Sequence, residues 1–120
     1  MNDIVVVDDD KDVLEIFIEF LEIKGFNIVG AGNNGKEAVA LYKKHSPNAI
    51  LLDVMMPEYD GIYALYHIRQ IDPDAIIIMV TADLSIDTQK KLQEYNASAI
   101  IHKPYDIDTV VDTINKIQNN

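Results

Sequence analysis

The 120-residue sequence contains no cysteine, and its 10 basic residues are only half as many as its 20 acidic residues. Without cysteine, the chain has neither a disulfide framework nor a thiolate-bound metal site. No run of about twenty apolar residues occurs, which excludes an apolar membrane-spanning helix, so we expect no membrane insertion. The formal net charge of −10 repels polyphosphates, and we therefore expect no direct binding of nucleic acid by this domain.

The amino terminus lacks the features of a secretory leader. The apolar run from Met1 to Val7 is short, meets acidic residues at once, and has neither a basic segment nor a cleavage-like site. We therefore expect a cytoplasmic location. A content of 48% hydrophobic and 25% charged residues is typical of a folded globular chain. Because no linker, repeat or low-complexity segment interrupts it, we expect residues 1–120 to form one domain.

Short apolar runs rich in β-branched residues alternate with longer stretches of helical period. The runs are continuous in apolar residues, which is typical of strands that are covered on both faces. We predict strands at residues 4–7, 27–30, 49–52, 75–80 and 98–101. Because crossovers between parallel strands are right-handed, this alternation predicts an α/β fold: a flavodoxin-like, doubly wound, five-stranded parallel sheet with strand order 2-1-3-4-5.

Five helices are expected to connect and follow these strands. The first is the clearest, because apolar residues recur at intervals of three and four from Leu14 to Leu21, and Gly25 follows as a stop signal. The other four are expected around residues 38–42, 65–69, 84–95 and 110–117. The helix around 84–95 has the weakest pattern.

Polar residues follow the carboxyl ends of four of the predicted strands. In a doubly wound sheet the binding crevice lies beyond these ends, next to the first strand. The residues are Asp8, Asp9 and Asp10 after the first strand, Asp53 after the third, Thr81 after the fourth and Lys103 after the fifth. A carboxylate cluster is costly unless a cation neutralises it, and oxygen ligands suit a hard divalent ion, so we expect Mg²⁺ there.

The same groups suit phosphoryl transfer. A carboxylate can attack phosphorus, while Lys103 and Thr81 can supply the positive charge and the hydrogen bond that the equatorial oxygens need. The product would be a mixed anhydride, whose added charge can reposition neighbouring loops. The residues therefore indicate a switch rather than a turnover site.

Four short motifs occur in one order, each at the end of a predicted strand. They are Val7-Asp8-Asp9, Leu52-Asp53 followed by Pro57 and Asp60-Gly61, Thr81-Ala82, and Lys103-Pro104. Each motif alone is weak, but all four in this order and spacing are specific. Over its whole length the chain resembles the receiver domains of response regulators, the phosphorelay proteins of two-component signalling.

The resemblance implies a role for each matching acidic residue. Asp53 would be the phosphoacceptor that becomes an aspartyl phosphate. Asp9, Asp53 and the backbone carbonyl of Met55 would bind Mg²⁺ directly, and Asp8 would act through water. Taken alone, Asp9 or Asp10 could equally cap the first helix.

The resemblance also implies roles for residues on the later strands. Thr81 would hydrogen-bond the phosphoryl group, and Lys103 would pair with an acceptor or phosphoryl oxygen. The Lys103–Pro104 peptide bond is expected to be cis. The phosphoryl donor would be a phosphohistidine on a sensor histidine kinase or a phosphotransfer protein.

A partner-binding face made by the fourth helix, fifth strand and fifth helix is a further expectation from the family. Its candidate residues are Ile100, Tyr105 and Val111. Ile100 departs from the family, since most members carry there an aromatic residue that swings inward when the threonine moves. Asn96 replaces a common glycine and tolerates the left-handed conformation. The downstream partner is unknown, and both a monomer and a phosphorylation-dependent dimer are compatible with the sequence.

Two alternatives assign the acidic cleft to other classes of protein. A magnesium-dependent phosphohydrolase with an aspartyl-phosphate intermediate would need a second acid–base carboxylate, for which Asp83 is the nearby candidate. A flavodoxin-type carrier would bind a flavin phosphate after the first strand, where the aspartates repel it. A further alternative within the receiver family is a degenerate receiver, which binds partners without being phosphorylated.

Overall fold

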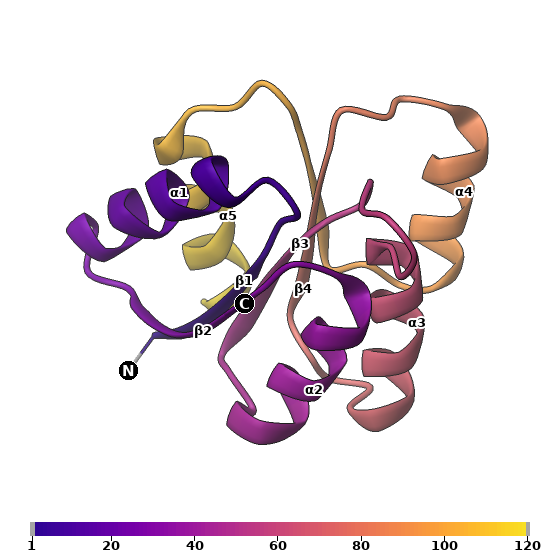
Figure 1. The fold of residues 1–120 in the computed structure, drawn as a ribbon, viewed down its shortest axis with the longest axis horizontal. Helices are drawn as coiled ribbons and strands as arrows, with labels where there is room; N and C mark the ends of the chain where they lie inside the picture. Colours follow the sequence, from indigo (N-terminus) through magenta and orange to yellow (C-terminus); the bar gives the residue numbers. More distant parts are fainter. Residues whose placement is uncertain (1, 120) are drawn as a thin grey trace.

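Five parallel strands and five helices alternate along residues 2–119, the part of the chain that the computed structural model describes (Figure 1). The strands are β1 (Asp3–Val7), β2 (Asn27–Gly32), β3 (Ala49–Asp53), β4 (Ile77–Thr81) and β5 (Ala99–His102). The helices are α1 (Lys11–Ile23), α2 (Gly35–His45), α3 (Gly61–Ile71), α4 (Ile86–Glu94) and α5 (Ile107–Gln118). The sheet order is β2-β1-β3-β4-β5, which confirms the predicted topology.

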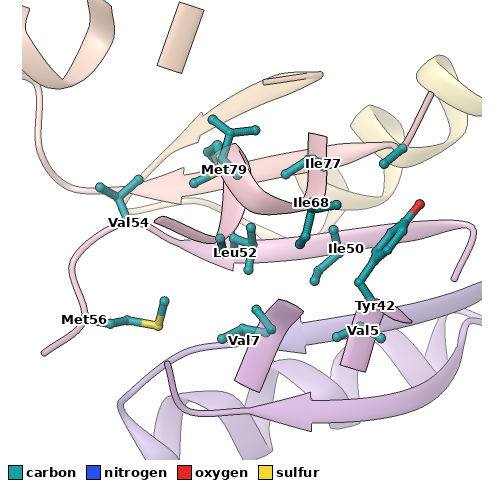
Figure 2. Packing of buried hydrophobic residues seen from close by; sticks show 14 of the residues in the cluster. Val5, Val7, Tyr42, Ile50, Leu52, Val54, Met56, Ile68, Ile77 and Met79 are labelled. Carbon is teal, nitrogen blue, oxygen red and sulfur yellow. The ribbon is translucent and has the colours of Figure 1, made fainter. Parts of the chain in front are cut away.

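Helices cover both faces of the sheet. The helices α1 and α5 lie on one face, and α2, α3 and α4 lie on the other (Figure 1). Because side chains alternate along a strand, Val5 and Val7 of β1 pack under α2 and α3, while Ile4 and Val6 pack under α1 and α5. Figure 2 shows the first of these two cores, in which Ile50 and other strand residues meet the α2 and α3 side chains.

The central strands match the expectation of cover on both faces, and the edge strands depart from it. Every residue of β3 and β4 is buried, whereas β2 and β5 are only partly buried. The difference follows from position, because β2 and β5 each have a neighbour on one side only. A continuous apolar run does not reveal whether its strand is central or at an edge.

Each helix begins at a polar side chain that caps its first turn. The capping oxygens accept hydrogen bonds from backbone N–H groups two or three residues further along the chain, and the capping residues are Asp10, Asn34, Asp60, Ser85 and Asp106. All five caps follow the carboxyl ends of strands, at one edge of the sheet. At the opposite end of the sheet, Gly25 follows α1 with φ 95° and Asn96 follows α4 with φ 61°, so both adopt the left-handed region. Gly25 was expected as the stop of the first helix, and Asn96 as a residue that tolerates this conformation.

Within residues 2–119, every helix is too short or too polar to cross a membrane.

Candidate functional site

The carboxyl ends of β1 and β3 bring three aspartates together. These strands are neighbours in the sheet, and Asp53 is the last residue of β3 while Asp8 directly follows β1. One carboxylate oxygen from each of Asp8, Asp9 and Asp53 lies within 4.8 Å of the other two. Asp8 is 6% exposed and Asp53 is 7% exposed, whereas Asp9 is open to solvent. The predicted acidic cluster is therefore formed at the predicted edge, with one side accessible.

Asp10 is separate from this cluster. Its Oδ1 accepts hydrogen bonds from the N–H groups of Asp12 and Val13, at 3.1 and 3.2 Å, and so caps α1. The backbone N–H of Asp10 donates to Asp8 Oδ1 at 2.9 Å. The capping role that the sequence allowed for either Asp9 or Asp10 belongs to Asp10, whose backbone N–H also helps to orient Asp8.

Lys103 places its ammonium group beside the two buried acids. Its Nζ lies 3.4 Å from Asp53 Oδ2 and 3.7 Å from Asp8 Oδ2. The backbone at this residue is held by the Lys103 N–H, which donates to the Thr81 carbonyl at 2.8 Å. The Lys103–Pro104 peptide bond is cis, as the resemblance implied. One positive charge thus partly offsets three carboxylates.

Burial raises the pKa of Asp53 from 3.8 to about 6. The Lys103 ammonium opposes this rise, the Asp8 carboxylate adds to it, and a hydrogen bond from the Met55 N–H lowers the pKa. The net increase shows that Lys103 alone does not compensate for bringing a charged Asp53 into this cleft. A divalent cation bound to the carboxylates would supply the missing positive charge.

Thr81 ends β4 and is fully buried. Its hydroxyl oxygen accepts a hydrogen bond from the Asp83 N–H at 2.8 Å. A hydroxyl can donate as well as accept, so Thr81 can also donate to an oxygen bound at the cleft.

The carboxylate of Asp83 is engaged by the start of α4. It accepts hydrogen bonds from the Thr88 hydroxyl at 2.6 Å and from the Ser85 N–H at 2.8 Å. These bonds hold the pKa of Asp83 below its usual value. A general acid at neutral pH needs a raised pKa, so this carboxylate does not suit the second acid–base role that a phosphohydrolase would need.

The three candidate residues of the partner face are not all at one place. Ile100 and Tyr105 line the same open pocket of about 560 Å³, together with Thr109 and Thr113 of α5. Ile100 packs against the core under α2, α3 and α4, and Tyr105 packs against the core under α1 and α5. Val111 also packs against the second of these cores and is not part of the pocket lining.

Sequence reasoning found the cluster and missed two local supports. Gly61 N–H donates to the Val54 carbonyl at 3.0 Å, and a Cβ on Gly61 would lie only 2.9 Å from the carbonyl carbon of Asp53. Gly61 therefore holds the backbone of the phosphoacceptor candidate at a distance that no other residue permits. The second support is Gly35, whose N–H donates to the Tyr59 carbonyl at 2.6 Å. A glycine after an aspartate indicates the start of a helix, but the sequence does not show which backbone segment that glycine contacts.

A doubly wound sheet that ends in three aspartates, a threonine and a lysine defines a signalling receiver rather than a nucleotide or flavin carrier. The family model of the response regulator receiver domain matches residues 4–115. The chain belongs to this family.

Curated relatives include chemotaxis proteins of the same size and longer regulators. The chain is 39% identical over 116 residues to the chemotaxis protein CheY of Bacillus subtilis, covering 97% of each protein. It is 34% identical to CheY of Halobacterium salinarum, covering 95% of this chain and 94% of that protein. The probable C4-dicarboxylate response regulator DctR of Priestia megaterium is 32% identical over 97% of this chain, which spans 51% of that protein.

Solved structures share the whole fold. A CheY-like receiver domain protein from Methanospirillum hungatei has a TM-score of 0.93 at 25% identity, covering 99% of this chain and 94% of that chain. A chain from the crystal structure of the CheX–CheY–BeF3–Mg²⁺ complex of Borrelia burgdorferi has a TM-score of 0.89 at 30% identity, covering 96% of this chain and 87% of that chain.

Proposed function

We propose that Asp53 accepts a phosphoryl group from the phosphohistidine of a sensor histidine kinase or a phosphotransfer protein. A carboxylate oxygen of Asp53 bonds to phosphorus as the phosphorus–nitrogen bond breaks, and the imidazole leaves with its electron pair and takes up a proton. One observation carries this proposal: Asp53 lies within a cluster of three carboxylates, and the Lys103 ammonium is 3.4 Å from its Oδ2. Lys103 can therefore compensate charge that develops on the transferred oxygens.

Mg²⁺ is the cofactor that fits these residues. Asp9, Asp53 and the backbone carbonyl of Met55 would bind it directly, and Asp8 would act through water. The donor set consists of oxygen atoms, and Asp9 is exposed to solvent. Burial raises the pKa of Asp53 despite the nearby Lys103 ammonium, so a bound cation would favour the ionised carboxylate. When bound, the ion would neutralise the carboxylates and the phosphoryl oxygens. The Borrelia burgdorferi complex, which contains magnesium and the fluoride BeF3, supports this assignment by likeness.

The phosphorylated chain would act as a switch rather than as an enzyme with a separate substrate. Its only catalysis would be its own phosphorylation and dephosphorylation. The added charge at Asp53 would draw the Thr81 hydroxyl toward it and alter the surface of α4, β5 and α5, to which a downstream protein would bind. Ile100, Tyr105 and Val111 are the candidate residues of that surface. In the absence of an aromatic residue at position 100, Ile100 would repack beside the pocket that it shares with Tyr105. A cytoplasmic location and a single domain over 1–120 stay predictions.

The test is intact-mass spectrometry after incubation with acetyl phosphate, with and without Mg²⁺. We expect one phosphoryl adduct on the native chain, dependent on Mg²⁺, and none on Asp53→Asn. Asp10→Asn is the matched control, because asparagine caps helices as well as aspartate and the side chain of Asp10 is outside the cluster. It should be modified like the native chain. An adduct that persists on Asp53→Asn would place the phosphoacceptor elsewhere, and no adduct on any chain would indicate a degenerate receiver.

Mg²⁺ affinity should depend on pH in the range set by Asp53. Above pH 6 the carboxylate is ionised and affinity should be nearly constant, whereas below its pKa of about 6 a proton competes with the ion. Apparent affinity should then fall by up to about tenfold for each pH unit. Mg²⁺ titrations followed by amide NMR spectra at several pH values would measure this. Affinity that is constant down to about pH 4, near the ordinary pKa of aspartate, would contradict the raised pKa.

A further inference from the structure

The loop between β3 and α3, residues 54–60, contains Met55 and is held by backbone contacts at both of its ends. At its base, the Gly61 N–H donates to the Val54 carbonyl at 3.0 Å. At its far end, the Tyr59 carbonyl accepts a hydrogen bond of 2.6 Å from the Gly35 N–H of α2. The second contact comes from a helix that contributes no residue to the acidic cluster.

Gly35 is suited to this contact by its place in α2. It is the first residue of the helix, where backbone N–H groups have no partner within the helix. The N-cap side chain of Asn34 satisfies the N–H of Glu37, at 2.9 Å, and not that of Gly35. The Gly35 N–H is therefore directed outward, and the carbonyl of Tyr59 takes the place of an intrahelical acceptor.

The contact is close enough to require glycine. A Cβ on Gly35 would lie 3.0 Å from the Tyr59 carbonyl oxygen and closer still to the Asp60 carbonyl oxygen. Both neighbours are backbone atoms, which cannot turn aside as a flexible side chain does. Any other residue at position 35 must therefore push residues 59–60 away from α2.

Aromatic contacts hold the same end of the loop. The Lys36 ammonium lies 5.6 Å from the centre of the Tyr59 ring, within the range of a cation–π contact. The Tyr59 ring packs on Tyr63 of α3, with 4.9 Å between ring centroids. The loop is thus fixed from α2 on one side and from α3 on the other.

We propose that Gly35 is a positioning residue for the metal site, because it fixes the loop that presents Met55 to Asp53. The inference rests on the proposed function, in which the Met55 carbonyl binds Mg²⁺. Support for the link between loop and site comes from the start of the loop, where Val54 directly follows Asp53 and its carbonyl accepts the Gly61 N–H at 3.0 Å. Hydrogen bonding from the Met55 backbone also lowers the pKa of Asp53. By thermodynamic linkage, the ion and the Gly35–Tyr59 hydrogen bond stabilise each other.

The first test compares Gly35→Ala with Gly25→Ala. Gly25 has φ 95° and no atom within 4 Å of the position of a Cβ, so its alanine variant is strained without touching the loop. The readout is the Kd for Mg²⁺ from amide NMR titration, with thermal unfolding alongside. We expect Gly35→Ala to raise the Kd by about 10- to 100-fold, the usual effect of losing a group that orients metal ligands. Gly25→Ala should lower the melting temperature and leave the Kd within about twofold of native, since only ligand orientation changes affinity.

The outcomes separate the inference from the proposed function. A Gly35→Ala variant that binds Mg²⁺ as tightly as the native chain would overturn the inference alone. A native chain that binds no Mg²⁺ would overturn the proposed function, and the inference with it. An equal rise of Kd in both variants would show that lost stability weakens binding, and would also overturn the inference.

The second test uses the native chain and stays decisive if Gly35→Ala does not fold. Hydrogen exchange of the Gly35 amide is compared with that of Ser46, whose N–H donates to Tyr42 at the other end of α2. At a Mg²⁺ concentration of about a hundred times Kd, exchange at Gly35 should slow by at least about tenfold more than at Ser46. Equal slowing at both amides would mean that Mg²⁺ acts only through global stability, and would overturn the inference.

Discussion

Asp53→Asn should stabilise the metal-free protein at neutral pH by about 1–3 kcal/mol. The pKa of Asp53 rises from 3.8 to about 6 on folding, so the ionised carboxylate is less favourable in the folded chain than in the unfolded chain. The contribution of this group to stability is complete below pH 3.8 and is lost as the pH rises through 6. Asparagine keeps the shape of aspartate and removes both the buried charge and its repulsion from Asp8.

Thermal unfolding with a chelator present would measure this effect. The melting temperature of Asp53→Asn should exceed that of the native chain by roughly 4 °C or more at neutral pH. The difference should shrink toward about pH 4, where Asp53 of the folded native chain is protonated. Asp10→Asn again serves as the control and should not be stabilised, because it removes a favourable charge from the start of α1. A native chain more stable than Asp53→Asn at neutral pH without Mg²⁺ would contradict the raised pKa.

This cost to stability fits a site selected for binding and chemistry. Replacing a functional polar group in a cleft often stabilises a fold, because the group is held in an environment that does not suit it alone. Mg²⁺ should make the native chain more stable than Asp53→Asn, since only the native chain keeps all three carboxylates. The ionised Asp53 carboxylate therefore destabilises the metal-free fold and serves as a ligand when Mg²⁺ is bound.

The sheet could be predicted from sequence because its central strands carry continuous apolar runs. Their residues are buried on both faces, so composition alone marks them. The prediction failed at some boundaries, where tertiary contacts decide. Residue 75 was expected to start the fourth strand, yet β4 begins at Ile77, and the Ala75 carbonyl accepts hydrogen bonds from the Arg69 guanidinium and the Ser98 hydroxyl instead.

Arg69 illustrates what periodicity cannot reveal. From the sequence, Arg69 was predicted only to lie in the third helix, together with Leu65 and Ile68. In the structure its guanidinium also donates to the Asn96 carbonyl and to the Ser98 hydroxyl, joining the end of α3 to the loop before β5. These partners are 27 and 29 positions away in the sequence, and no local pattern connects them.

The site was predictable because parallel strands place their carboxyl ends at one edge. Strand ends alone therefore brought Asp53, Thr81 and Lys103 together with the aspartates after β1. Strand ends did not indicate whether Asp9 or Asp10 caps α1, since aspartate is a good capping residue at either position. The contact of Gly35 with Tyr59 was equally hidden, because it depends on how α2 and the loop before α3 pack.

Lys103→Met should slow phosphorylation of Asp53 by acetyl phosphate by about a hundredfold, while leaving the fold intact. The Lys103 ammonium lies 3.4 Å from Asp53 Oδ2, at the place where negative charge develops on the transferred oxygens. Methionine retains most of the length and the apolar stem of lysine and removes the charge together with its hydrogen-bond donors. Loss of one preorganised electrostatic partner of a transition state typically costs about 10²- to 10³-fold in rate.

The same substitution has a second consequence that separates chemistry from metal binding. Lys103 lowers the pKa of Asp53, so its loss should raise that pKa further above 6 and shift the pH profile of Mg²⁺ binding upward. At pH values well above the new pKa, removal of a positive charge beside the carboxylates should strengthen Mg²⁺ binding. Lys103→Arg, which keeps the charge with a different geometry, should be phosphorylated by acetyl phosphate faster than Lys103→Met. Phosphorylation of Lys103→Met at the native rate would show that the ammonium near Asp53 takes no part in phosphoryl transfer.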